Sequence, residues 1–156
     1  MTTLHQADAL ILHQADARIL HQADALILQQ GLRSTAVRAR VLAFLLAQHS
    51  AVTHHQIESA LNADQKIDRV TLYRTLDWLL EKNLAHKVVG VDRAWCFRAN
   101  ASDSMHQHHA HFKCQRCAKV ICLDALRASG QAPALPEGYR SVEVELTIKG
   151  VCPQCA

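Results

Sequence analysis

The stretch 69-RVTLYRTLDWLLEKNLAHKVVGVDRAWCFRA-99 changes its periodicity halfway along. Up to Asn83 its leucines recur at helical spacing, and Asp68 stands where an N-cap is expected. The expected buried stripe consists of Leu72, Leu76, Leu79 and Leu80. After Asn83 come two short β-type runs, 84–89 and 94–99, on either side of a turn that starts at Gly90. A helix followed by a two-stranded hairpin is typical of the second half of a winged helix-turn-helix.

The residues before this stretch supply the other helices of such a domain. Apolar residues recur at helical spacing over residues 34–49, and Thr53 is a suitable N-cap for a short helix that ends at Leu61. The sequence therefore predicts a winged-helix domain over residues 29–98. Its third helix would expose a polar face that includes Arg69, Tyr73 and Arg74.

Residues 1–28 form an extension built from an octad that occurs three times, as LHQADALI, LHQADARI and LHQADALI. Its composition favours helix. A period of eight rotates the apolar stripe by about 80° per copy, so one straight helix cannot bury all three copies against one surface. We interpret the repeat as a duplication that lengthened a terminal helix.

The last third of the chain is predicted to be a small α/β domain, residues 106–156, joined by a polar linker over residues 99–105. HFKC (111–114) and KVICL (119–123) suit strands, and DALRAS (124–129) suits a short helix. SVEVELTIKG (141–150) alternates as a half-buried strand does. The fold class is thus α+β. A domain this small usually needs a disulfide or a metal to be stable.

Two CxxC pairs provide that metal site. Four thiolates in a tetrahedron suit zinc, and the predicted structural ligands are Cys114, Cys117, Cys152 and Cys155. The alternative, a disulfide scaffold, would need an exported protein. The N-terminus MTTLHQADAL lacks the basic start of a signal peptide, and no apolar run is long enough to span a bilayer. We therefore expect a reduced, cytoplasmic protein.

Other histidines and cysteines remain for a second ion. His109 and His111 share one face of a strand, and His86 and Cys96 lie on the two predicted wing strands. An ion held by these four residues would bridge the two domains and change their relative orientation. The alternative is that Cys96 is a buried, small apolar residue and that the clustered histidines are ordinary surface residues.

At this point the chain resembles the ferric/zinc uptake regulator (Fur/Zur) family of metal-dependent repressors. Four segments carry the resemblance, in the family's order, across residues 29–156: GLRSTAVRARVLAFL, TLYRTLDWLLEKNLAHKV, HHAHFKCQRCAKVI and the terminal CPQC. The resemblance implies a homodimer that binds an AT-rich inverted repeat in double-stranded DNA when metal is bound. Tyr73 and Arg74 match the family's Tyr-Arg pair on the recognition helix, and these side chain types can contact a thymine methyl and a guanine or phosphate.

The resemblance also bears on the metal. A cysteine in the regulatory site is associated with the zinc-sensing branch, and Cys96 and His86 fall at ligand places, whereas ferrous ion prefers nitrogen and oxygen ligands. Two departures stand out: Ala110 replaces an acidic ligand, and Cys122 stands where many members have glutamate. Cys122 either replaces that carboxylate in the regulatory site, serves an accessory site with His106 or His108, or is a buried strand residue.

The sequence therefore predicts a zinc-responsive repressor of zinc uptake genes, with one structural and at least one regulatory zinc ion per chain. The alternatives are an iron-, manganese- or peroxide-responsive regulator of the same family, or a cytosolic zinc carrier. The middle third has the most positive balance, with ten Lys/Arg against six Asp/Glu in residues 31–98, which favours an anionic partner. An enzyme is not expected, because the zinc-hydrolase and deaminase motifs are missing, and neither a membrane nor a small-molecule substrate is implied.

Overall fold

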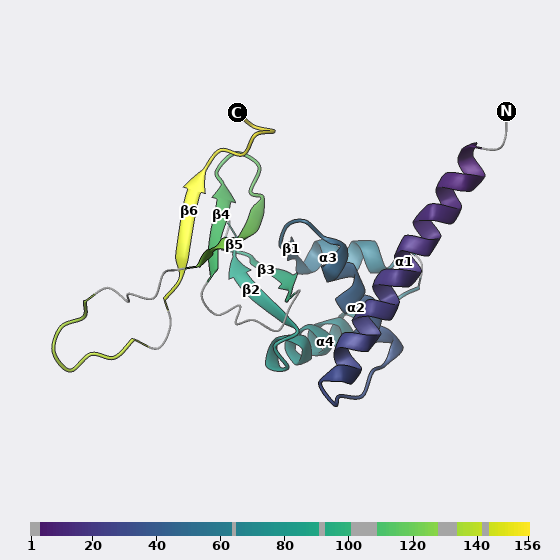
Figure 1. Ribbon diagram of the computed structural model, residues 1–156, viewed down its shortest axis with the longest axis horizontal. Helices are drawn as coiled ribbons and strands as arrows, with labels where there is room; N and C mark the ends of the chain where they lie inside the picture. The colour runs from purple at the N-terminus through teal and green to yellow at the C-terminus, as the bar shows by residue number, and fades with distance from the viewer. Residues whose placement is uncertain (1–3, 64, 91–92, 101–108, 128–133, 142–143) are drawn as a thin grey trace.

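The computed structural model describes residues 4–63, 65–90, 93–100, 109–127, 134–141 and 144–156. Figure 1 shows a helical part and a strand-rich part, with a small sheet between the helices and the second sheet. Although α1 (Leu4–Gln29) runs for 26 residues, neither it nor another helix among the described residues combines the length and apolarity that a bilayer crossing requires.

The octad repeat is a single helix, α1, which ends before Gly31, whose φ is +70°. Only its C-terminal part enters the core: Ala23 and Ile27, both from the third copy, are completely buried. The N-terminal part of α1 projects beyond the other helices in Figure 1. The predicted helix is confirmed, and one surface receives the last copy, as the drift of the stripe requires.

Three capped helices follow, and the two predicted caps, Thr53 and Asp68, are in place. In α2 (Ala36–Ala47), Thr35 is the N-cap. In α3 (His54–Leu61), Thr53 forms a capping box: its hydroxyl accepts from the Gln56 amide and its own amide donates to the Gln56 side chain at 2.8 Å. In α4 (Arg69–Glu81), the Asp68 carboxylate accepts from the Thr71 amide at 2.9 Å.

The first sheet has the strand order β1-β3-β2 and is antiparallel throughout. Its strands are β1 (Val52–Thr53), β2 (Ala85–Val89) and β3 (Trp95–Ala99). A single core joins this sheet to all four helices and includes Leu42, Leu76 and Phe97. Three helices with a two-stranded wing confirm the winged-helix prediction.

The second sheet has the order β5-β4-β6, with β6 (Leu146–Gly150) parallel to β4 (His109–Cys114). The short helix predicted from Asp124 onward is wrong, because β5 (Val120–Arg127) stays extended and pairs with β4 as far as Arg127. The long predicted strand is shorter, since β6 begins only at Leu146. Its apolar side chains are not buried within one chain: Leu146 is 43% and Ile148 is 39% exposed.

The two sheets meet at one junction. The Ala51 amide donates to the Val120 carbonyl at 2.8 Å, and a small apolar cluster of Ala51, Val88, Cys96 and Val120 surrounds this hydrogen bond. β2 and β3 are thereby held beside β5. The predicted domain boundaries stay predictions, and residues 101–105 of the predicted linker lie outside the described residues.

Candidate metal centres and nucleic-acid interface

The four predicted structural ligands come together at one end of the second sheet. The sulfurs of Cys114, Cys117, Cys152 and Cys155 all lie within 4.8 Å of one another. Cys114 ends β4, and the Cys114 amide donates to Lys119 across the β4–β5 turn. The second CxxC follows β6, where the Gln115 amide donates to Gly150. The group therefore ties the ends of all three strands together.

Hydrogen bonding within this group shifts the pKa values of two of its thiols in opposite directions. Hydrogen bonds from the Cys117 and Cys152 amides lower the pKa of Cys114 to about 6. Hydrogen bonds to the Cys152 and Cys117 side chains raise the pKa of Cys155 to about 12. All four are thiols rather than disulfide halves, with 3.7 Å between the Cys117 and Cys152 sulfurs. Four thiol sulfurs at this spacing fit a tetrahedral zinc ion, in agreement with the cysteine site that the sequence predicts.

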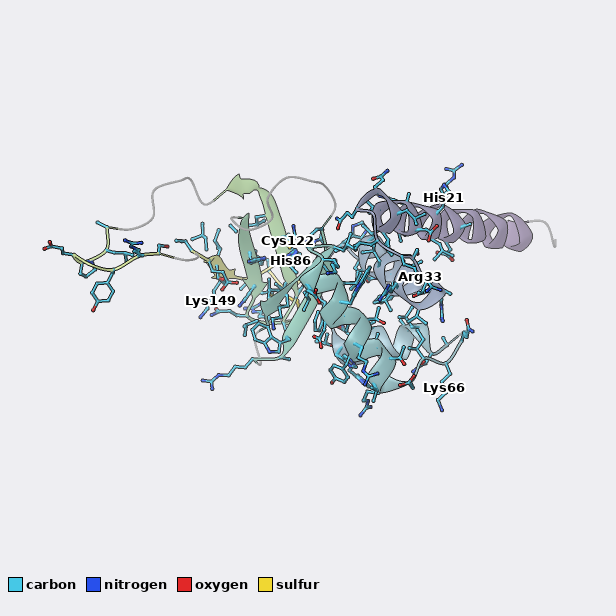
Figure 2. All side chains as sticks on the ribbon, turned by 90° about the horizontal axis from the view of Figure 1, so that it is seen from below. His21, Arg33, Lys66, His86, Cys122 and Lys149 are labelled. Carbon is cyan, nitrogen blue, oxygen red and sulfur yellow. The ribbon has the colours of Figure 1, made fainter. Side chains whose placement is uncertain are left out.

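A second group of donors bridges the two sheets. It consists of His86 from β2, His111 from β4 and Cys122 from β5, whose ligand atoms lie within 4.8 Å of one another. His111 and Cys122 are register partners in the β4–β5 hairpin. The Cys122 sulfur is 3.4 Å from His86 Nε2, and Figure 2 shows these two side chains close together where the sheets meet. Two imidazoles and one thiol at this spacing also fit a transition metal such as zinc.

The other predicted ligands of this site are placed differently. Cys96 is not in this group: its side chain is buried in the apolar junction cluster, and burial raises the pKa of its thiol. It faces Val88, whereas His86 faces Arg98, so Cys96 lies about 7 Å farther along the sheet. The side chain of His109 lies outside what the structure describes, as do His106 and His108.

Sequence reasoning missed one residue beside this group, Asn100. It follows β3, is 7% exposed, and its side chain contacts the Nδ1 atom of His86. An asparagine at a strand end carries no signal of its own, because its role depends on what the fold brings near it.

The three predicted DNA-contacting residues lie on the exposed face of α4. Tyr73 is 49% exposed and stacks on His54 with the ring centroids 3.7 Å apart. Partial burial in this stack lowers the pKa of His54. Arg69 pairs with Glu58 at 3.2 Å, and Arg74 is also exposed. A hollow of about 430 Å³ lies between α3, the start of α4 and β3, and Arg69 and Tyr73 line it.

Comparison with known proteins agrees with this architecture. A profile described as the ferric uptake regulator family matches residues 29–149, which is most of the chain. The ferric uptake regulation protein of Synechococcus elongatus is 31% identical over 97 residues, which cover 61% of this chain and 64% of that relative, or just under two thirds of its length. The zinc uptake regulation protein of Escherichia coli is 26% identical over 130 residues, which cover 81% of this chain and 75% of that relative.

A solved structure of a zinc uptake regulator complexed with zinc and DNA has the same fold. It aligns with a TM-score of 0.65 at 24% identity, and the alignment covers 90% of this chain and 94% of the chain in that structure. The winged helix, the second sheet with its cysteine group and the family match over residues 29–149 lead to one conclusion. The chain belongs to the ferric uptake regulator family, whose members are dimeric, DNA-binding, metal-responsive transcription regulators.

Proposed function

We propose that this protein is a zinc-responsive transcriptional repressor that controls zinc uptake genes and binds an AT-rich inverted repeat as a homodimer. The observation that carries the proposal is the group of His86, His111 and Cys122 at the junction of the two sheets. Because its donors come from both sheets, a shared ligand fixes the orientation of the winged helix relative to the rest of the chain.

The choice of zinc rests on Cys122. A thiolate beside two imidazoles suits zinc better than ferrous ion, which prefers nitrogen and oxygen donors. Sequence similarity alone does not separate the branches, since relatives named for iron and for zinc uptake both match. Of the sequence-based alternatives for Cys122, its distance of 3.4 Å from His86 Nε2 supports a place in the regulatory site.

Two kinds of metal site follow from this proposal. Cys114, Cys117, Cys152 and Cys155 hold a structural zinc ion, which leaves no open position for chemistry. His86, His111 and Cys122 hold the regulatory ion, with His109 as the further ligand that the sequence predicts. The assignment of Cys96 to this site also stays a prediction and is tested below.

The proposed DNA contact is the face of α4 that carries Arg69, Tyr73 and Arg74. All three are exposed, and the ring of Tyr73 is held by its stack on His54. The proposed dimer contact is the edge strand β6, where the exposed Leu146 and Ile148 lie next to each other on one face. A cytosolic zinc carrier, the alternative function, would need neither the DNA-contacting face nor the dimer contact.

The metal assignment can be tested with protein whose cysteine group retains zinc. Zinc or ferrous ion is added without oxygen while binding to inverted-repeat DNA is followed by fluorescence anisotropy. We expect zinc to raise the affinity on the order of 100-fold, a coupling of about 3 kcal/mol. Activation by ferrous ion and not by zinc would transfer the protein to the iron-responsive branch.

A matched pair of cysteine variants tests the ligand set. Cys122→Ser should lose one zinc ion per chain in native mass spectrometry and lose the zinc-dependent gain in DNA affinity. Cys96→Ser should keep both, because Cys96 packs in the apolar junction cluster. Loss of the second ion from Cys96→Ser would return Cys96 to the ligand set, and retention of that ion by Cys122→Ser would remove Cys122 from it.

A second pair separates a repressor from a zinc carrier. The double change Tyr73→Ala with Arg74→Ala should abolish operator binding while the zinc content stays at the wild-type value. Arg140→Ala, which removes an exposed cation outside α4, should change neither property. Full operator binding by the double variant would remove α4 from the interface.

A further inference from the structure

Asn100 is a buried polar residue at the end of the wing that makes contacts in two directions. Its Nδ2 donates to the main-chain oxygen of Asn83 at 2.8 Å and, at 3.2 Å, to the side-chain oxygen of the same residue. Its Oδ1 lies 2.5 Å from Nδ1 of His86. The main-chain N–H of Asn100 also donates to the Leu84 carbonyl at 2.9 Å, so the backbone that carries the side chain is anchored as well.

These partners fix the orientation of the Asn100 side chain. A main-chain carbonyl only accepts hydrogen bonds, so the side chain must turn its NH₂ group toward Asn83. Its Oδ1 atom is then the one facing His86, and Nδ1 of His86 must carry the hydrogen. The lone pair of His86 therefore lies on Nε2, the nitrogen that points at Cys122. Metal-binding histidines are commonly held by such a bond from the second ring nitrogen.

The other contact of Asn100 is the C-terminal end of α4. Asn83 follows the helix with a φ of +56°, and its amide donates to Leu80 while the Leu84 amide donates to Leu79. This is a Schellman motif, which fixes where the helix stops. The carbonyl of Asn83 points out of this motif to Asn100. One side chain thus contacts both the end of α4 and a ligand of the second metal group.

We propose that Asn100 is a positioning residue: it holds His86 for binding through Nε2 and links the second metal site to the C-terminal end of α4. The inference rests on the proposed function, because it takes the group of His86, His111 and Cys122 as the regulatory site. It adds a residue that touches neither metal nor DNA yet acts on both. The connection runs through the two ends of one amide, Oδ1 to His86 and Nδ2 to Asn83, so the contacts of each end can be removed separately.

The test uses three variants of the full-length protein with zinc in the cysteine group. Asn100→Ala removes the side-chain contacts to both His86 and Asn83. Asn100→Asp keeps an acceptor for His86 but cannot donate to Asn83. Asn83→Gly is the matched control: it removes the longer contact to Asn83 Oδ1 but keeps the main-chain acceptor at 2.8 Å, and glycine adopts the positive φ readily. Cobalt(II) is titrated into the second site and followed by its thiolate charge-transfer absorption, and operator binding is measured with and without cobalt.

We expect Asn100→Ala to bind cobalt about 10- to 100-fold more weakly, as loss of a residue supporting a ligand usually does. Asn100→Asp should bind cobalt like the wild type but show a cobalt-dependent gain in DNA affinity reduced on the order of 10-fold. Asn83→Gly should match the wild type in both. Wild-type cobalt affinity and spectrum in Asn100→Ala, or a full gain in Asn100→Asp, would overturn the proposal.

Failure of the proposed function gives a different pattern. In that case the wild type itself shows no gain in DNA affinity on cobalt binding. The cobalt affinities of the Asn100 variants still decide whether Asn100 positions His86, because that readout involves no DNA.

Discussion

At the scale of single residues, Ala118 has an unfavourable backbone conformation beside the cysteine group. It follows Cys117 directly and has a φ of +60°, a conformation that costs a residue with a Cβ roughly 1–2 kcal/mol. Glycine would remove that cost but lose about 0.5–1 kcal/mol through the greater freedom of its unfolded chain. Ala118→Gly should therefore stabilise the zinc-loaded protein by about 0.5–1 kcal/mol, measured by denaturant unfolding at fixed zinc.

A second alanine serves as the control. Ala43 lies inside α2, where glycine destabilises a helix by about 1 kcal/mol. The two Ala→Gly changes should thus have opposite signs. Destabilisation by both would mean that the positive φ of Ala118 is not a source of strain.

The metal ligands show how far single residues can be predicted from sequence. The two CxxC pairs can be recognised as candidate ligands from their spacing alone, because each brings two sulfurs together locally. Cys122 could have been found from the hairpin, since a tight turn after Cys114 puts it opposite His111. Which wing residue meets this pair depends on how the sheets are docked. That is why Asn100 was missed, and why the place of Cys96, predicted together with His86, stays a prediction.

At the scale of elements, α3 depends on its capping box. Thr53 accepts from the Gln56 amide, so Thr53→Ala should cost about 1 kcal/mol of unfolding free energy, whereas Thr53→Ser should retain most of it. Because α3 carries His54, which stacks on Tyr73, the alanine variant should also bind DNA more weakly. An unchanged unfolding midpoint for Thr53→Ala would show that the box contributes nothing.

The edge strand β6 gives a prediction about assembly. Ile148→Lys places a charge on the exposed apolar face of this strand, and we expect sedimentation to show monomers at concentrations where the wild type is dimeric. Lys149→Ala, the next residue along, should remain dimeric. Dimerisation of Ile148→Lys at wild-type concentrations would move the interface away from β6.

The elements that sequence patterns predicted correctly have local causes. α3 and α4 begin at their caps, and α4 buries Leu72, Leu76 and Leu79 of its expected stripe and half-buries Leu80, because capping and helical periodicity are properties of neighbouring residues. The failures come from distant partners. Residues 124–127 have a composition that tolerates a helix, but hydrogen bonding to β4 keeps them extended. The alternation of residues 142–148 correctly indicated a strand, yet pairing with β4 decides that it starts at Leu146.

At the scale of the whole molecule, the two halves are stabilised in different ways. The main hydrophobic core lies entirely between Ala23 and Ala99. Among the described residues beyond Ala99, the buried side chains other than Asn100 are Ala110, His111, Cys114, Val120 and Cys152. Two of these five belong to the cysteine group, so an ion bound there would replace much of a core.

Removing zinc from the cysteine group should therefore unfold the second sheet and leave the winged helix folded. After treatment with a strong chelator, we expect hydrogen exchange to lose protection in β4, β5 and β6 while α2 and α4 keep theirs. Dimerisation should be lost at the same time. Uniform loss of protection along the chain would show instead that the winged helix cannot hold its fold alone.

The docking of α1 through its last octad has a consequence for how this chain can change. Each octad lengthens a helix by about 12 Å, and the added turns emerge at the end that points away from the folded body. A slip during copying that inserts or drops one unit would alter the reach of this arm in fixed steps, without touching Ala23 or Ile27. The arm is in effect a segment whose length evolution can vary while the regulator behind it stays the same.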